Sequence, residues 1–274
     1  MFARRSLLAV VLLVAGMVTA KGGQPATIYS MRAVGEVQIS PDGHVSDYTL
    51  RSQLPKEIAA LVDKNIRGWT FEPIQVEGHA VSAKTAVNLQ LKAEPAGGEQ
   101  YKIRVVSVHF GGPMQSRAQT KPPQYPPSAI HAHVGGRVLL SVRLDETGKV
   151  IEAAPYQTSL DIDKGTEREA ERWRKVLENA SVEAAKNWQY DLTETINGKP
   201  IGTSAIVPVE FSLSRNASHD GHWKDYYPGP ATPTPWMHKE QVADNQSLSD
   251  LQNGESLSLD SRFKLKDDVV GKTL

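Results

Sequence analysis

The sequence predicts an α+β protein built from two small modules, each a three-stranded antiparallel sheet with a helix packed on one face, followed by a disordered tail. Three observations predict this class. A strand–turn–strand–helix–strand pattern occurs twice, in residues 26–92 and 121–213. Apolar residues alternate in the strands and recur at helical spacing in the helices. Residues 214–274 show neither periodicity.

The N-terminus resembles a secretory signal peptide. Arg4 and Arg5 precede an apolar run from Leu7 to Val18, and small residues end at Ala20. We therefore expect cleavage after Ala20 and export to the periplasm. The alternative is an uncleaved membrane anchor, but a spanning helix needs roughly 20 apolar residues.

The first module begins with a weakly alternating strand over residues 33–39 and a turn at Gly43. Proline suits the first turn of a helix, so a helix is expected to begin near Pro55. It carries an apolar stripe that ends at Trp69. An alternating strand, Lys84–Lys92, closes the module.

The second module repeats this order with a stronger pattern. Its first strand alternates from Val138 to Leu144, and Gly148 takes the turn position that favours positive φ. Its helix is longer and leads to Trp188, and a closing strand follows at Ser204–Ser212. The matched tryptophans are predicted to fill the space between helix and sheet rather than to bind a ligand.

Two further segments complete the chain. Residues 93–120 are a linker with a possible extra strand, the strand-like run Tyr101–Phe110. Residues 214–274 are polar and rich in proline and serine, which predicts a mostly disordered tail. The alternative is a recognition tail, because extended proline-rich segments bind with little ordering cost.

Composition limits the chemistry. The chain has no cysteine, so its fold cannot use disulfides, and its 31 basic residues match 31 acidic ones, unlike a nucleic-acid binder. No catalytic motif occurs, so we expect no enzyme activity and no cofactor. A group of histidines and an aspartate in the tail matches no metal-ligand template, so no metal site is expected there: His219, His222, Asp225 and His238.

Several motifs together resemble the C-terminal domain of TonB, the energy-transducing protein of Gram-negative envelopes. The second module carries most of them, and Trp69-Thr70-Phe71-Glu72-Pro73 in the first module is also similar. In the second module these are Pro122-Pro123-Gln124-Tyr125-Pro126-Pro127-Ser128-Ala129, Gly136-x-Val138, Asp145-x-x-Gly148-x-Val150, Asn197-Gly198-Lys199-Pro200 and Val207-Pro208-Val209-Glu210-Phe211. The resemblance implies protein partners such as outer-membrane transporters, bound along the closing strand.

Both closing strands are expected to lie at sheet edges, where a partner segment can be added as a strand. Pro208 supports an edge because proline has no N–H for a neighbouring strand, whereas Asn88 takes that position in the first module. A second hypothesis is structural: the edges are paired within the chain or in a homodimer. The candidate binding residues are Lys84, Thr85, Val87, Asn88, Leu89, Ser204, Ala205, Ile206, Val207, Val209, Glu210 and Phe211.

Overall fold

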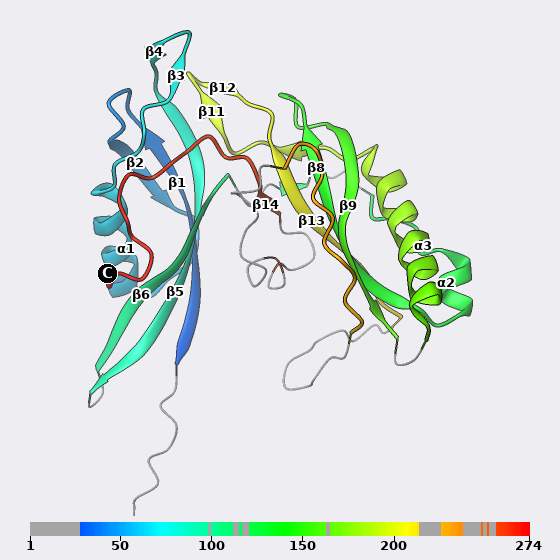
Figure 1. Cartoon of the computed structure of the whole chain (residues 1–274). Helices are drawn as coiled ribbons and strands as arrows, with labels where there is room; N and C mark the ends of the chain where they lie inside the picture. The colour runs from blue at the N-terminus through cyan, green and yellow to red at the C-terminus, as the bar shows by residue number, and fades with distance from the viewer. Residues whose placement is uncertain are drawn as a thin grey trace, which may run out of the picture.

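The computed structural model describes residues 28–97, 100–111, 115–116, 121–162, 165–213, 226–237, 248, 251 and 256–274. The expected signal peptide, residues 1–20, lies outside these residues. The fold is α+β, and every strand pair in it is antiparallel. Figure 1 shows two sheets in the middle of the molecule, each with a helix on its outer side.

The first sheet is built on the order β2–β1–β5, with β6 paired to β5. Helix α1 covers one face and buries Val62 and Ile66. Trp69 and Phe71 follow the helix and pack in the same core. The elements are β1 (Tyr29–Ile39), β2 (Val45–Leu50), α1 (Lys56–Arg67), β3 (Gln75–Val76), β4 (His79–Ala80), β5 (Ala83–Gly97) and β6 (Gln100–Phe110).

The second sheet has the order β14–β13–β8–β9. Its helix α3 begins at a capping box in which Thr166 and Glu169 satisfy each other's backbone N–H groups. Ala170, Leu177 and Ala185 face the sheet from this helix. The elements are α2 (Pro127–His131), β8 (Gly135–Leu144), β9 (Val150–Asp161), α3 (Glu167–Ala185), β13 (Ser204–Phe211) and β14 (Leu257–Ser258).

Short strands connect the first sheet and its helix with the second sheet and its helix, the two halves of the molecule. The hairpin β11 (Thr195–Ile196) and β12 (Lys199–Pro200) leaves the second half and pairs with β5. In return, β7 (Gln115–Ser116) follows the first sheet and pairs with β10 (Tyr190–Asp191). The first sheet therefore has six strands and the second has four, in place of two separate three-stranded sheets. Sheet edges gain hydrogen bonds when such segments pair with them, which explains the difference.

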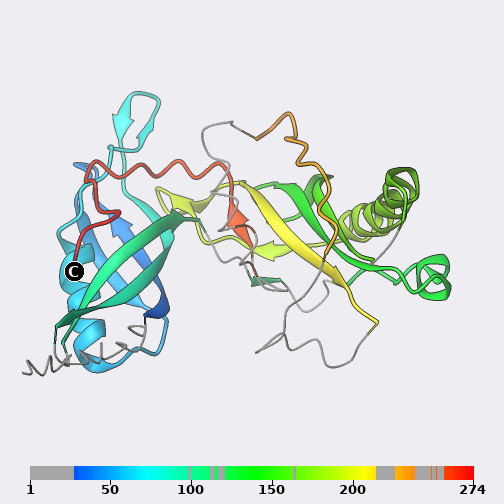
Figure 2. The same ribbon diagram turned by 60° about the horizontal axis from the view of Figure 1, so that its bottom comes forward.

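The prediction of a disordered tail is wrong for residues 226–237 and 256–274. Tyr227 and Leu160 exchange backbone hydrogen bonds of 2.8 and 3.0 Å, so the first segment pairs with β9. The second runs from β14 to the first sheet, where the Val105 N–H donates to the Lys272 carbonyl and the Gly271 N–H donates to the Val105 carbonyl. Both views show this red C-terminal segment crossing between the halves (Figures 1 and 2).

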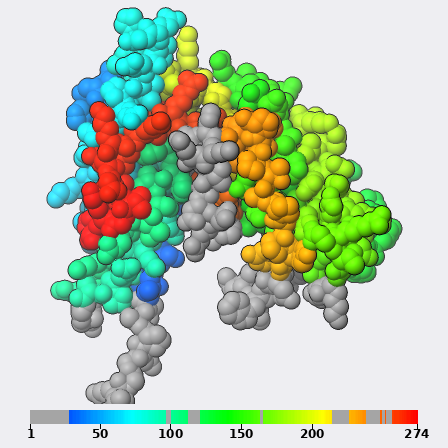
Figure 3. Space-filling view, viewed as in Figure 1, coloured from blue at the N-terminus to red at the C-terminus, as the bar shows by residue number. Residues whose placement is uncertain are grey.

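Sparse apolar residues explain why this tail packs. The face of the second sheet opposite α3 carries Leu139, Tyr156 and Ile206, which form a further core with tail residues. The tail supplies Trp236, Met237, Leu248, Leu251, Leu257 and Leu259. Figure 3 shows the orange and red tail segments lying against the body of the molecule. Average composition concealed these residues because they are separated by polar ones.

Candidate partner-binding edge

The backbone N–H and C=O groups of every second residue of β13 point away from β8. The Ser204 N–H donates to Asp260 Oδ1 at 2.6 Å, and the Ser204 carbonyl accepts from the Leu259 N–H at 2.7 Å. Because alternate residues of an antiparallel strand point their polar groups to the same side, Pro208 and Glu210 also face outward. The absent N–H of Pro208 thus falls on the outer side, where no bond to β8 is lost.

Strand β14 covers only the beginning of this outer side. It pairs with Ala205 and Ile206. Within the described part of the chain, no strand pairs with residues 207–209 on the side away from β8. The edge therefore begins covered and continues without a described partner strand.

The side chains of β13 are mostly buried. Ala205, Val207, Val209 and Phe211 lie in the core beneath α3. Ser204 and Ile206 are buried on the opposite face, and Glu210 is partly exposed. An incoming strand would consequently meet backbone groups along the edge rather than a row of exposed side chains.

The predicted edge at Lys84–Lys92 is wrong. Strand β5 lies between β1 and β6, and its pairing with β6 includes Val87, Asn88 and Leu89. Lys84 pairs with Thr195 of β11, and the Thr85 hydroxyl is buried. The physical reason is proximity: β6 comes next after β5 in the chain, and it adds Val105, Val108 and Phe110 to the same core. The run Tyr101–Phe110 was recognisable as a strand, but its pairing partner was not.

Glu194 lies where the two halves and the tail meet, and no motif in the residues around it indicates this. Its carboxylate accepts hydrogen bonds from Thr85 Oγ1 at 3.0 Å and Ser261 Oγ at 2.7 Å. Glu194 is 2 % exposed. Burial raises the pKa of its carboxyl, against the lowering effect of the two hydroxyl donors.

The stability of this junction should therefore depend on pH. A raised pKa in the folded state means that the folded protein holds the proton more tightly than the unfolded chain. Stability should fall as pH rises from the ordinary Glu value of 4.5 through the folded pKa. We expect Glu194→Gln to remove this fall, so the variant should gain stability relative to the parent as pH rises. Urea unfolding of both proteins between acidic and neutral pH measures it; a constant difference would contradict the assignment.

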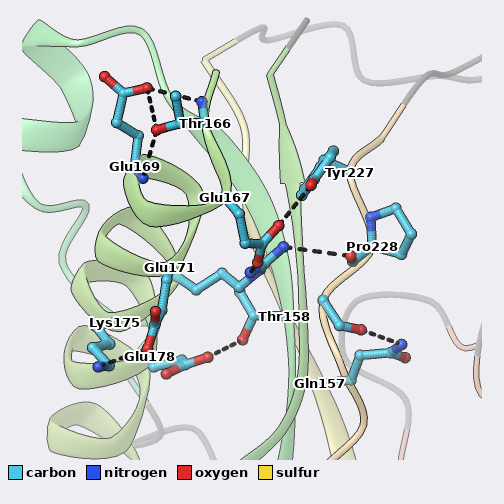
Figure 4. Close-up of polar contacts among 12 residues, drawn as sticks. Gln157, Thr158, Thr166, Glu167, Glu169, Glu171, Lys175, Glu178, Tyr227 and Pro228 are labelled. Atoms are coloured by element: carbon cyan, nitrogen blue, oxygen red, sulfur yellow. Dashed lines mark hydrogen bonds and ion pairs between the residues drawn. The ribbon is translucent and has the colours of Figure 1, made fainter. Parts of the chain in front are cut away.

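Strand β9 forms the other edge of the second sheet, and tail residues 226–229 lie over it and contact α3. Arg174 is buried and bonds Glu167 at 2.6 Å, and its guanidinium lies 5.3 Å from the ring centre of Tyr227. The Tyr227 hydroxyl donates to the same Glu167 at 2.6 Å, and Gln157 donates to the Gly229 carbonyl at 2.9 Å. Figure 4 shows the tail passing beside the helix at these contacts. Together they hold residues 226–229 over β9.

Removal of the Arg174 side-chain charge should loosen this segment. Arg174→Met leaves Glu167 and Tyr227 without their shared cation, and we expect a local loss of about 1–3 kcal/mol. Cleavage near Tyr226–Tyr227 by chymotrypsin should accelerate. Lys175→Met is the matched control, because Lys175 pairs with Glu171 on the exposed side of the same helix and such pairs contribute about 0–1 kcal/mol. Equal cleavage rates in the two variants would contradict the role of Arg174.

The described residues contain no cluster of three or more His, Asp or Glu side chains suited to a metal ion. The residues considered for metal binding, His219, His222, Asp225 and His238, lie outside the described part. Among the described helices, none combines the length and apolar character needed to cross a membrane.

Comparisons with known proteins show similarity to TonB proteins over part of the chain. No family model matches the chain, and no solved structure matches it. The TonB proteins of two Xanthomonas campestris pv. campestris strains, B100 and ATCC 33913, are each 31 % identical to it over 99 residues. The match covers 36 % of this chain and 38 % of each relative, so it spans well under half of the relatives' length. This similarity supports a TonB-like C-terminal domain within the chain.

Proposed function

We propose that this chain is an exported, non-enzymatic envelope protein that binds extended segments of other proteins at the outer edge of β13. Outer-membrane transporters are the first candidates, by similarity to TonB proteins. The observation that carries the proposal is the outer edge of β13, where β14 pairs at Ala205 and Ile206 as an added strand would and no described strand continues that pairing over residues 207–209. A strand added there would gain main-chain hydrogen bonds without disturbing the core.

We also propose that residues 26–92 and 121–213 are two copies of one TonB-like module. The turn glycines support this. Gly43 and Gly148 have φ of 91° and 78°, and each packs against the carbonyl of an aromatic residue, Phe71 and Tyr190 respectively. The hairpins after the helices also match, since Glu77 and Asn197 both have positive φ beside a glycine.

The structural alternative fits the first sheet better than the second. Strand β5 has β11 beside Lys84 and β6 beside Val87–Leu89, so binding at Lys84–Leu89 would first require displacement of both strands. We therefore place partner binding on β13 alone. A second copy of this chain is the competing occupant of that edge, as in a homodimer.

Site-specific crosslinking in intact cells tests the proposal. A photo-crosslinking amino acid at Glu210, at the outer edge of β13, should form adducts with outer-membrane transporters. Gln75, an exposed residue of β3, is the control position and should form few adducts. Adducts with a second copy of the chain would favour the structural alternative, and equal yields of transporter adducts at both positions would contradict edge binding.

A further inference from the structure

We propose that tail residues Leu257–Asp260 are an internal surrogate for the partner, and that the β13 edge selects extended peptides with two apolar side chains two residues apart, followed by an acidic residue. This inference rests on the proposed function and specifies its ligand. It also implies that the tail competes with the partner for the beginning of the edge.

The tail meets β13 as an added strand would. Ile206 pairs with Leu257 and Ala205 pairs with Ser258, in antiparallel register. The Leu259 N–H continues the ladder to the Ser204 carbonyl. Main-chain bonds of this kind supply affinity in strand addition, and side-chain sites on alternate residues supply selectivity.

Two apolar sites receive the alternate side chains. Leu257 and Leu259 are 4 % and 2 % exposed, and both lie in the core that includes Leu139, Tyr156 and Ile206. Because residues two apart in a strand share a face, an incoming peptide needs the same spacing to fill both sites. Ser258, on the other face, lies beside the Thr203 hydroxyl at 3.1 Å.

The acidic residue caps the first backbone donor of β13. Asp260 Oδ1 accepts from the Ser204 N–H at 2.6 Å and from the Thr203 hydroxyl at 2.9 Å. Hydrogen bonds to a charged acceptor are stronger than neutral ones, so a partner with Asp or Glu here has an advantage. An open cavity lined by Arg143, Thr203, Asp260 and Arg262 leaves space beside this point.

The tail segment can leave the edge without losing its second attachment. Phe263 is buried in the core of the first sheet, and Lys264 and Lys266 bond to the backbone of Glu72 and Thr70. Residues 257–260 would therefore remain tethered close to the edge, at a high effective concentration. A partner peptide must compete with that tethered segment.

Peptide binding to the full chain tests this competition. The probe is a labelled, end-capped peptide with the sequence of residues 256–262, titrated while the amide resonances of residues 204–207 and 209–211 are followed. Asp260→Ala weakens the tail but leaves β13 unchanged, and we expect it to bind the probe about tenfold more tightly than the unmodified chain. A probe with alanine in place of its aspartate should bind about tenfold more weakly than the parent probe.

A disulfide gives the matched control. Ala205 and Ser258 form a non-hydrogen-bonded pair, in which side chains approach closely, so Ala205→Cys with Ser258→Cys can pin the tail onto the edge in this cysteine-free chain. The oxidised form should bind no probe, and reduction should restore binding. Thermal unfolding confirms that each variant folds.

Two results would overturn the inference. Equal binding by oxidised and reduced forms would place the probe elsewhere on the surface. Absence of binding by folded Asp260→Ala would show that the tail sequence is no surrogate ligand. In either case, transporter adducts at Glu210 would leave the proposed function standing, and their absence would count against that function separately.

Discussion

Replacement of Gly148 by alanine should destabilise the protein by about 4 kcal/mol, the combined cost of a strained backbone and of overpacking. Gly148 has φ of 78°, which side chains disfavour, and an added Cβ would lie 1.9 Å from the Tyr190 carbonyl oxygen. That carbonyl belongs to the segment directly after Trp188, whose position depends on the core. The turn can relieve the clash only by moving β8 and β9 away from this segment.

Gly198→Ala is the control that separates the two costs. Gly198 has φ of 75°, but an added Cβ would meet nothing within 4 Å. Only backbone strain applies there, so we expect a loss of about 1–2 kcal/mol. Urea unfolding followed by circular dichroism measures both variants. Equal losses would show that the contact with Tyr190 is relieved at little cost.

Truncation of Trp188 to alanine should cost about 3–5 kcal/mol, the range for large aromatic residues in a core. Trp188 is 4 % exposed and meets the Tyr190 ring edge-on, with ring centres 6.4 Å apart. Its indole N–H donates to the Lys121 carbonyl at 2.7 Å. The variant would leave a cavity between α3 and the sheet and would also free the segment before α2.

Two further variants test that account. Trp188→Phe keeps most of the packing and loses the hydrogen bond, so we expect a loss of about 1–2 kcal/mol. Trp69→Ala should resemble Trp188→Ala, because Trp69 is 3 % exposed and its indole N–H bonds to Asn65 Oδ1 at 3.0 Å. Chemical unfolding measures all three. A small effect at only one tryptophan would contradict the equivalence of the two halves.

Local patterns predicted the elements well. Alternation from Val138 to Leu144 corresponds to β8, and the apolar stripe before Trp69 corresponds to α1. The turn glycines were predicted at Gly43 and Gly148, and both have positive φ. These features depend on near neighbours in the chain, so the sequence carries them directly.

The edges were less predictable. Ile206 departs from the alternation of apolar and polar residues along β13, and the structure explains this by a second buried face that Ile206 shares with Leu139. The continuous apolar run at Val138-Leu139-Leu140 is the matching signal, since a strand buried on both faces need not alternate. The run does not indicate which segment covers this second face, because the tail leucines that cover it lie more than a hundred residues further along the chain.

The α+β class, the two sheet-and-helix patterns and the turn geometry can be predicted from the residues alone, because each arises from residue spacing over a few positions. Which strands lie at sheet edges depends instead on contacts between distant parts of the chain. Pairing of β6 with β5, of β14 with β13 and of Tyr227 with Leu160 of β9 joins segments whose backbone groups are chemically alike. Backbone N–H and C=O groups are the same in every residue except proline, so they do not specify which strands pair. Only the three-dimensional arrangement selects among the possible partner strands.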